Sequence, residues 1–212
     1  MSMVAAQPNH GPLVGNEGSR PIQPAWVRIT HWLNALAVLV LITSGWRIYN
    51  ASPIFAFRFP KEITFGGWLG GALLWHFAAM WLLAVNGVIY LAINVISGRL
   101  RQRFWPLSAH RILADLRAAV HGRLAHEDLR QYNAVQKFAY LVAIALLVLV
   151  VLSGLAIWKS VQLPLLRELM GGYDNARVVH FFAMAGVVLF TLVHVTMVAV
   201  VPKTLRVMVF GR

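Results

Sequence analysis

Four long apolar stretches alternate with polar segments along the chain, at 27–49, 68–96, 134–158 and 178–201. Each is long enough to cross the hydrocarbon core of a bilayer as an α-helix, which takes roughly 20 residues. The second is long enough to tilt or to protrude. No strand-like alternation competes with this pattern. The pattern therefore predicts an all-α membrane protein, a four-helix transmembrane bundle.

Composition supports a membrane protein and narrows the cofactor chemistry. The chain is 59% hydrophobic and only 12% charged, whereas soluble domains are roughly half apolar and a quarter charged. Cysteine is absent, which excludes disulfides, iron–sulfur clusters, thiolate-bound zinc and covalently attached c-type haem. Any metal or haem must therefore be held noncovalently by histidine, methionine or oxygen ligands.

The basic residues are divided unevenly between the two sides of the membrane that four spans define. Of the 19 lysines and arginines, 6 lie in or beside the connections that follow the first and third stretches. The other 13 lie near the two termini and in or beside the 97–133 connection. Because cytoplasmic segments are enriched in Lys and Arg, both termini and this connection are predicted to be cytoplasmic. The net charge of +12 then needs no nucleic acid partner.

The segments outside the spans suggest three parts. Residues 1–25 are rich in Pro, Gly, Asn and Gln, and we expect a disordered cytoplasmic tail. They contain no apolar run typical of a cleavable signal peptide, so the first span is expected to remain as an anchor. The membrane domain is predicted over 26–205, and a cytoplasmic C-terminal tail over 206–212. The spacing within 97–133 fits either a helix on the membrane surface or a solvated basic connector.

Four of the eight histidines, His31, His76, His180 and His194, lie inside the apolar stretches. Ionisable residues at membrane depth are costly and are functional candidates, although a single one is more often structural. His180 and His194 are 14 residues apart, so on a helix they leave the same face about 21 Å apart. Histidines at the same depth in the membrane can meet. His31 therefore pairs with His194 on the cytoplasmic side, and His76 pairs with His180 on the outer side. Each pair could give two axial imidazoles to one haem iron, which favours electron transfer over oxygen binding.

An internal repeat relates the first two stretches to the last two. Residues 75–80 (WHFAAM) resemble 179–184 (VHFFAM), and Ser-Gly occurs at 44–45 and again at 153–154. The two glycines could admit a flat macrocycle or only allow close helix packing, and both interpretations stay open. The remaining two histidines align with tyrosines, His31 with Tyr140 and His194 with Tyr90.

Two arginines each precede a histidine of the set by three residues. Arg28 precedes His31, and Arg177 precedes His180. Each would lie one helical turn nearer to the water than the histidine. They could pair with haem propionates, or extend their charges to the membrane surface without a specific partner.

These features together resemble the bacterial and nickel-hydrogenase type of the cytochrome b561 family. The resemblance covers about 25–205 and rests on the RITHW motif at 28–32, His76, the His180 and His194 pair, and the YNAVQK motif at 132–137. It implies two b-type haems bound between the helices, one held by His31 and His194 on the cytoplasmic side. The other would be held by His76 and His180.

The resemblance also implies a quinone site beside the cytoplasmic-side haem. Asn133 and Gln136, at the start of the third span, are the candidates for it, and Asn34 is a weaker one. Each of these residues could instead cap a helix or form an interhelical hydrogen bond. The long connections imply a larger redox partner on the outer face of a bacterial inner membrane, such as a molybdoenzyme or a hydrogenase.

The leading hypothesis is a dihaem cytochrome b, the electron-transfer subunit of an oxidoreductase complex, which connects the quinone pool to a partner enzyme. One alternative is a free-standing oxidoreductase that passes electrons from superoxide or another small donor to quinone. Another is a histidine-lined transporter of metal ions or protons. That transporter would be colourless, and it would not account for histidines paired by depth.

Overall fold

The computed structural model describes residues 22–98 and 134–211, and between them residues 110, 112, 114, 115 and 117. Four long helices run through it: α1 (Ala25–Ala51), α2 (Leu69–Ile96), α5 (Ala134–Trp158) and α7 (Tyr173–Val200). Each is long and apolar enough to cross a membrane. Within the described residues, the prediction of a helical protein with four helices able to span a membrane is therefore confirmed.

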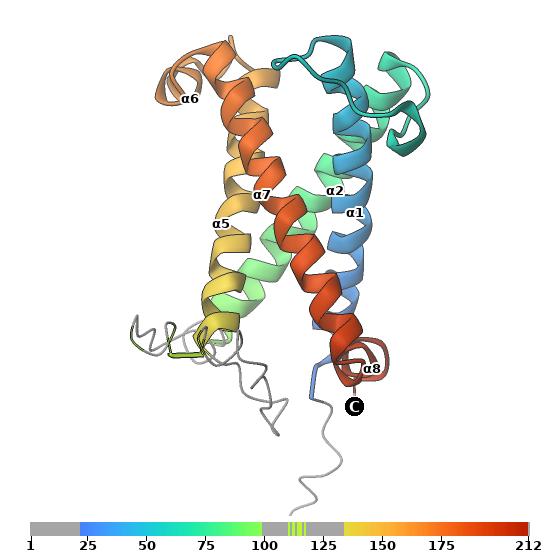
Figure 1. Cartoon of the computed structure of the whole chain (residues 1–212). Helices are drawn as coiled ribbons and strands as arrows, with labels where there is room; N and C mark the ends of the chain where they lie inside the picture. Colours follow the sequence, from blue (N-terminus) through green and yellow to red (C-terminus); the bar gives the residue numbers. More distant parts are fainter. Residues whose placement is uncertain are drawn as a thin grey trace, which may run out of the picture.

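The long helices form two hairpins, α1 with α2 and α5 with α7 (Figure 1). Small residues let the helix backbones approach closely in membranes. Alanines are accordingly buried in both hairpins, at positions 37, 72 and 79 in the first and at 143, 156, 176 and 183 in the second. Helix α7 is oblique: it runs from the α6 end of the molecule, where it lies beside α5, to the α8 end.

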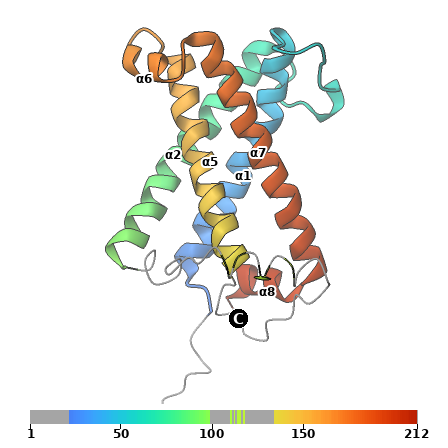
Figure 2. The same ribbon diagram turned by 60° about the vertical axis from the view of Figure 1, so that its left-hand side comes forward.

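Short elements lie at the two ends of the bundle (Figure 2). The connections that hold η2 (Lys61–Ile63) and α6 (Pro164–Leu169) share one end, which we call the outer end. The start of α1, the end of α2 and α8 (Lys203–Phe210) share the other, which we call the inner end. Helix α7 begins at Tyr173, five residues before the predicted start, because Gly171 and Gly172 take positive φ angles of 81° and 93° and end the preceding turn.

Helix α8 lies where the sequence analysis expected only a tail. It begins after Pro202 and ends at Gly211, whose φ of 85° is typical of a glycine that terminates a helix. Val207 is buried, and the N–H of Ile22 donates a hydrogen bond of 2.8 Å to the carbonyl of Gly211. The two ends of the described chain are therefore joined at the inner end. With only eight residues, α8 is too short to cross a membrane, so the search for long apolar stretches in the sequence did not detect it.

Two predictions fall largely outside the described residues. They are the disordered tail, of which residues 1–21 are not described, and most of the amphipathic segment within 97–133. Asp115, which is described, accepts a hydrogen bond of 2.8 Å from the N–H of Ala134. A carboxylate at this place satisfies a free donor at the start of α5 and suits the positive end of the helix dipole.

Candidate functional site

The four membrane histidines form two pairs that meet between the hairpins. His31 on α1 faces His194 on α7, with ring centroids 6.0 Å apart and ring planes at 65°. His76 on α2 faces His180 on α7, with centroids 6.4 Å apart and planes at 63°. The structure thus brings together the same two pairs that equal depth indicated. Both pairs use α7, one near each end.

The separation of the rings fits two imidazoles bound to opposite sides of one metal. A metal–imidazole bond is about 2 Å long, and the ring centre lies about 1 Å beyond the nitrogen, so two opposed ligands place their centroids about 6 Å apart. No group of three or more His, Asp or Glu among the described residues could hold a metal ion. Two imidazoles without further protein ligands suit a group that brings its own equatorial ligands, as haem does.

Ser44 orients His76 in the outer pair. The Ser44 hydroxyl donates to the carbonyl of Val40 at 2.5 Å and lies 3.1 Å from Nδ1 of His76. Because the single hydroxyl proton is directed to the carbonyl, the serine oxygen accepts the Nδ1–H of the imidazole. The other nitrogen, Nε2, is then the unprotonated one, which is the form that binds a metal.

The second hairpin repeats this arrangement. The Ser153 hydroxyl donates to the carbonyl of Leu149 at 2.6 Å and lies 3.0 Å from Nδ1 of His180. Ser153, like Ser44, is fully buried. The sequence analysis noted both serines as part of the repeat and assigned them no role. A polar residue kept at the same place in two apolar helices was the signal that could have identified them.

The glycines next to these serines leave room for the histidine rings. A Cβ added at Gly45 would lie 3.4 Å from Cε1 of His76, and one added at Gly154 would lie 3.3 Å from Cε1 of His180. Within each hairpin, the glycine therefore lets an imidazole edge approach the backbone of the facing helix. The group packed against each glycine is thus the ring of a candidate ligand.

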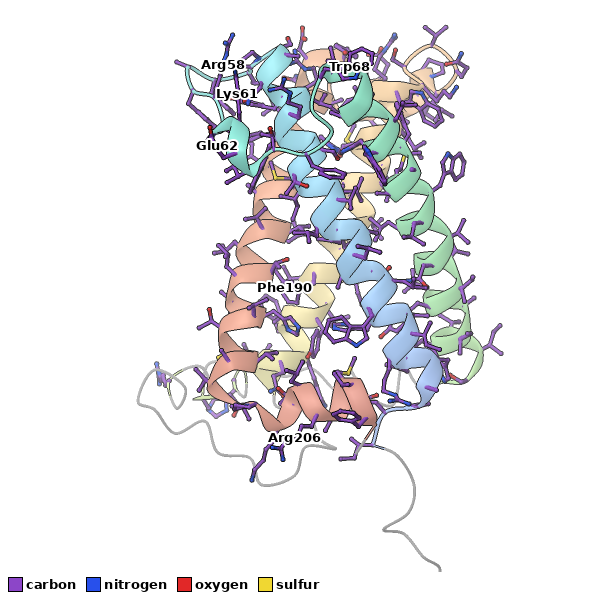
Figure 3. All side chains as sticks on the ribbon, turned by 90° about the vertical axis from the view of Figure 1, so that its right-hand side faces the viewer. Arg58, Lys61, Glu62, Trp68, Phe190 and Arg206 are labelled. Carbon is purple, nitrogen blue, oxygen red and sulfur yellow. The ribbon has the colours of Figure 1, made fainter. Side chains whose placement is uncertain are left out.

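Aromatic rings surround the inner pair. His31 lies edge-on to Trp32 at 5.4 Å, and His194 stacks on Phe190 at 5.8 Å with an interplanar angle of 11°. Figure 3 shows Phe190 in the inner half of the bundle. Tyr140, the repeat counterpart of His31, lies 6.5 Å from Phe190. Among the described residues, no side chain forms a hydrogen bond with either imidazole of this pair.

Helix α8 is tied to the turn of α1 that carries His31. Nη1 of Arg28 donates to the carbonyl of Val209 at 2.7 Å, and Nε1 of Trp32 donates to the carbonyl of Met208 at 3.2 Å. These carbonyls belong to the last turn of α8, where the helix itself leaves them free and its dipole is negative. Arg28 is therefore bound to a neighbouring element and does not merely extend to the surface.

Arg28 and Arg177 differ in the hydrogen bonds that they form. Nε of Arg28 is buried without a hydrogen-bond partner in the described part of the chain. A buried donor left unpaired costs free energy, so this atom fits an anionic group such as a haem propionate. Nη2 of Arg177 donates to the carbonyl of Ser52 at 2.5 Å and joins α7 to the end of α1.

The candidate quinone residues do not form one cluster in the described structure. Asn34 accepts a hydrogen bond of 2.7 Å from Nδ2 of Asn86, which also donates to the carbonyl of Thr30 at 2.7 Å. Asn34 thus takes part in an interhelical hydrogen bond, and its buried partner Asn86 was not identified from the sequence. Gln136 is exposed at the start of α5, and Asn133 lies outside the described residues.

Comparison with known proteins identifies a family and a similar protein. The family model for prokaryotic cytochrome b561 matches residues 22–211, a range that contains both histidine pairs. The chain is also similar to a proposed protein-methionine-sulfoxide reductase subunit, YedZ1, of Azospira oryzae. The two are 62% identical over 190 residues, which cover 90% of this chain and 96% of the relative.

Proposed function

The chain belongs to the prokaryotic cytochrome b561 family and is a membrane cytochrome b, and from this premise we propose its specific role. It holds two b-type haems and carries electrons between the quinone pool and a protein-methionine-sulfoxide reductase on the outer face of a bacterial inner membrane. We name this reductase, where the sequence analysis gave only a molybdoenzyme or a hydrogenase as examples, because the relative that is 62% identical carries that name.

One observation carries the proposal: two opposed imidazole pairs lie at the two ends of α7. The centroid distances of 6.0 Å and 6.4 Å suit one metal in each pair. Fourteen residues of helix separate His180 from His194, which corresponds to about 21 Å along the helix axis. Two redox sites at this spacing span most of a hydrocarbon core that is about 30 Å thick.

The protein's own residues position and protect the cofactors. A bound haem would supply a one-electron carrier at each site. His76 and His180 would hold the outer haem, and His31 and His194 would hold the inner one. Ser44 and Ser153 hold the outer imidazoles in the metal-binding tautomer. Arg28 and Arg177 lie one turn nearer to the two membrane surfaces and are the proposed propionate partners.

The inner end is the proposed place of quinone exchange. Gln136 is exposed at the start of α5, and Asn133 precedes it in the sequence. Oxidation of a quinol there releases two electrons and two protons. Reduction of a methionine sulfoxide consumes two electrons and two protons and releases the thioether and water, so the two reactions balance. In the sequence, 13 of the 19 lysines and arginines lie near the termini and in or beside the 97–133 connection, which supports cytoplasmic termini.

A haem titration tests the proposal. Purified chain, expressed with ample haem, should give about two b haems per chain in a pyridine haemochrome assay. His180→Ala and His194→Ala should each remove one haem, and the same haem should be lost in His76→Ala as in His180→Ala. His110→Ala, outside the membrane helices, serves as the control and should keep both. A colourless wild-type protein would contradict the proposal and favour a transporter.

A further inference from the structure

Hydrogen bonds from residues of α1 fix the conformation of the connection between α1 and α2. The Asn50 side chain donates to the carbonyl of Phe59 at 2.8 Å and accepts from its N–H at 2.9 Å. The Tyr49 hydroxyl bonds both the N–H and the carbonyl of Phe55, at 3.2 Å and 3.3 Å. The N–H of Phe65 donates to the carbonyl of Thr43 at 3.1 Å. A surface ordered in advance in this way loses little conformational entropy on binding.

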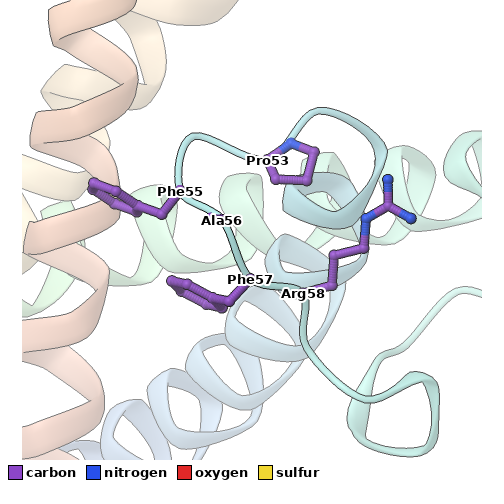
Figure 4. Close-up of a pocket in the computed structure, with 5 residues that line it drawn as sticks. All are labelled: Pro53, Phe55, Ala56, Phe57 and Arg58. Atoms are coloured by element: carbon purple, nitrogen blue, oxygen red, sulfur yellow. The ribbon is translucent and has the colours of Figure 1, made fainter.

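This connection lies against the turn of α7 that carries an outer histidine. Phe55 and Phe57 stack nearly parallel, with centroids 6.2 Å apart and an angle of 2°. Their rings lie 5.2 Å and 6.2 Å from that of Phe181, which follows His180 in the sequence. Figure 4 shows Phe55 reaching toward α7, while Arg58 points to the other side of the connection. The rings therefore join this connection to the α7 residue that follows His180.

A surface pocket lies at this point. Its volume is about 420 Å³, and its lining residues are Pro53, Phe55, Ala56, Phe57 and Arg58. Phe55 and Phe57 remain 37% and 45% exposed although they pack on Phe181. Aromatic residues and arginine are the side chains most enriched at the energetic centres of protein interfaces.

The rim of the pocket is positively charged. Arg58 and Lys61 are exposed, and neither forms an ion pair with the described residues. Figure 3 shows both at the outer end with Glu62, the acidic residue in this connection. Three other cations of the outer end already have partners: Arg167 pairs with Glu168, Arg177 bonds Ser52, and Lys159 lies over the ring of Trp158. Arg58 and Lys61 are therefore exposed cations that a partner could reach at this end.

We propose that this surface, formed by Phe55, Phe57, Arg58 and Lys61, docks the soluble redox enzyme. Its occupant is an acidic segment of that enzyme, with an apolar side chain seated in the pocket. This inference rests on the proposed function, because it assumes that electrons leave or enter at the outer histidine pair. Docking here would place the enzyme against the connection that packs on Phe181, the residue next to His180.

Anionic lipid headgroups are the competing occupant of the cationic rim. Headgroups would be attracted by Arg58 and Lys61 alone and would not need the ordered pair of phenylalanines. The built pocket and its contact with the His180 turn favour a protein segment. The two occupants respond differently to membrane composition, and this difference is the basis of the test.

The test uses the dihaem protein in phosphatidylcholine nanodiscs and the soluble catalytic subunit of the protein-methionine-sulfoxide reductase from the same organism. Stopped-flow spectroscopy follows reoxidation of the reduced haems by the enzyme with methionine sulfoxide present. The double variant R58E/K61E should lower the second-order rate constant by roughly tenfold or more at low salt, because electrostatic steering is lost. F57S should lower it at all salt concentrations. R206E, which reverses an exposed cation at the inner end, is the matched control and should react at the wild-type rate.

The haem spectrum of each variant, and its reduction by dithionite, show whether the protein is intact. R58Q/K61Q provides a milder change if charge reversal prevents assembly. Equal rates for wild type, F57S and the charge variants overturn the docking surface while leaving the proposed function in place. A charge effect confined to nanodiscs that contain phosphatidylglycerol assigns the surface to lipid and also overturns it. If the wild-type protein transfers no electrons to the enzyme, the partner is wrong and the docking surface falls with it.

Discussion

The outer and inner histidine pairs are built differently although α7 serves both. In the outer pair, each imidazole is held by a buried serine and lies against a glycine, and the two hairpins supply equivalent residues. In the inner pair, the imidazoles are flanked by Trp32 and Phe190. The repeat counterparts of these two histidines are tyrosines and not histidines. The outer site therefore follows from the repeated hairpin, while the inner site depends on elements that occur only once.

Helix α8 is the most important of those single elements. It supplies carbonyl acceptors to Arg28 and Trp32, which stand on either side of His31 in the sequence. No element of the described chain has the same relation to the outer pair, where the loop after α1 and Arg177 join the hairpins instead. The two sites should therefore respond to different mutations.

The largest effect is expected from removing α8. A chain that ends at Pro202 loses both carbonyl acceptors and the contact between Ile22 and Gly211. We expect haem content to fall from about two to about one per chain, because the turn that carries His31 loses its anchor while His76 and His180 keep their serines. Pyridine haemochrome analysis measures this, with Arg206→Ala in the full chain as the control. Loss of the outer haem alone would contradict the comparison.

Removal of the two serines should affect the opposite site. In Ser44→Ala combined with Ser153→Ala, both outer imidazoles lose the acceptor that fixes the Nδ1–H tautomer. Loss of the hydrogen-bond partner of a metal-binding histidine typically weakens metal binding by roughly 10- to 100-fold. Competition of the purified protein with apomyoglobin for haem should show one weakened site of two. Two sites of unchanged affinity would show that the serines only fill space.

A smaller effect is expected from a single methyl group. In Gly154→Ala the new Cβ would lie 3.3 Å from Cε1 of His180, so the ring must move by a few tenths of an ångström. We expect a shift in the midpoint potential of the outer haem in a spectroscopic redox titration, with the inner haem unchanged. Gly87→Ala is the matched control, because a Cβ there meets no atom within 4 Å. Equal shifts in both variants would mean that the effect is not local.

The smallest effect is expected at Trp32. Trp32→Phe keeps an aromatic ring beside His31 and removes only the donor to Met208. One exposed hydrogen bond contributes about 0.5–1.5 kcal/mol, so thermal loss of the inner haem should begin a few degrees earlier while haem content at room temperature stays normal. The Soret band followed during heating measures this. A variant that loses the inner haem outright would show that the indole donor is essential for the site.

The sequence alone predicted much of this arrangement. Helix number and the depth of each histidine follow from the length of the apolar stretches and a constant rise per residue, which do not depend on other parts of the chain. His31 and His194, which are 163 positions apart in the sequence, could thus be matched without knowledge of packing. The repeat likewise pointed to Ser44 and Ser153 as equivalent positions, although not to their bonds with His76 and His180.

Only the tertiary structure decided the contacts between segments that are distant in the sequence. Asn86 could not be recognised as the partner of Asn34, nor Val209 as the partner of Arg28, because periodicity reports which face a residue occupies and not what it meets. In the same way, the α1–α2 connection packs on Phe181 because side chains of α1, of the connection and of α7 meet at one place. Local rules determine the spans and the depth of the histidines, whereas hydrogen bonds across helices determine how each histidine is held.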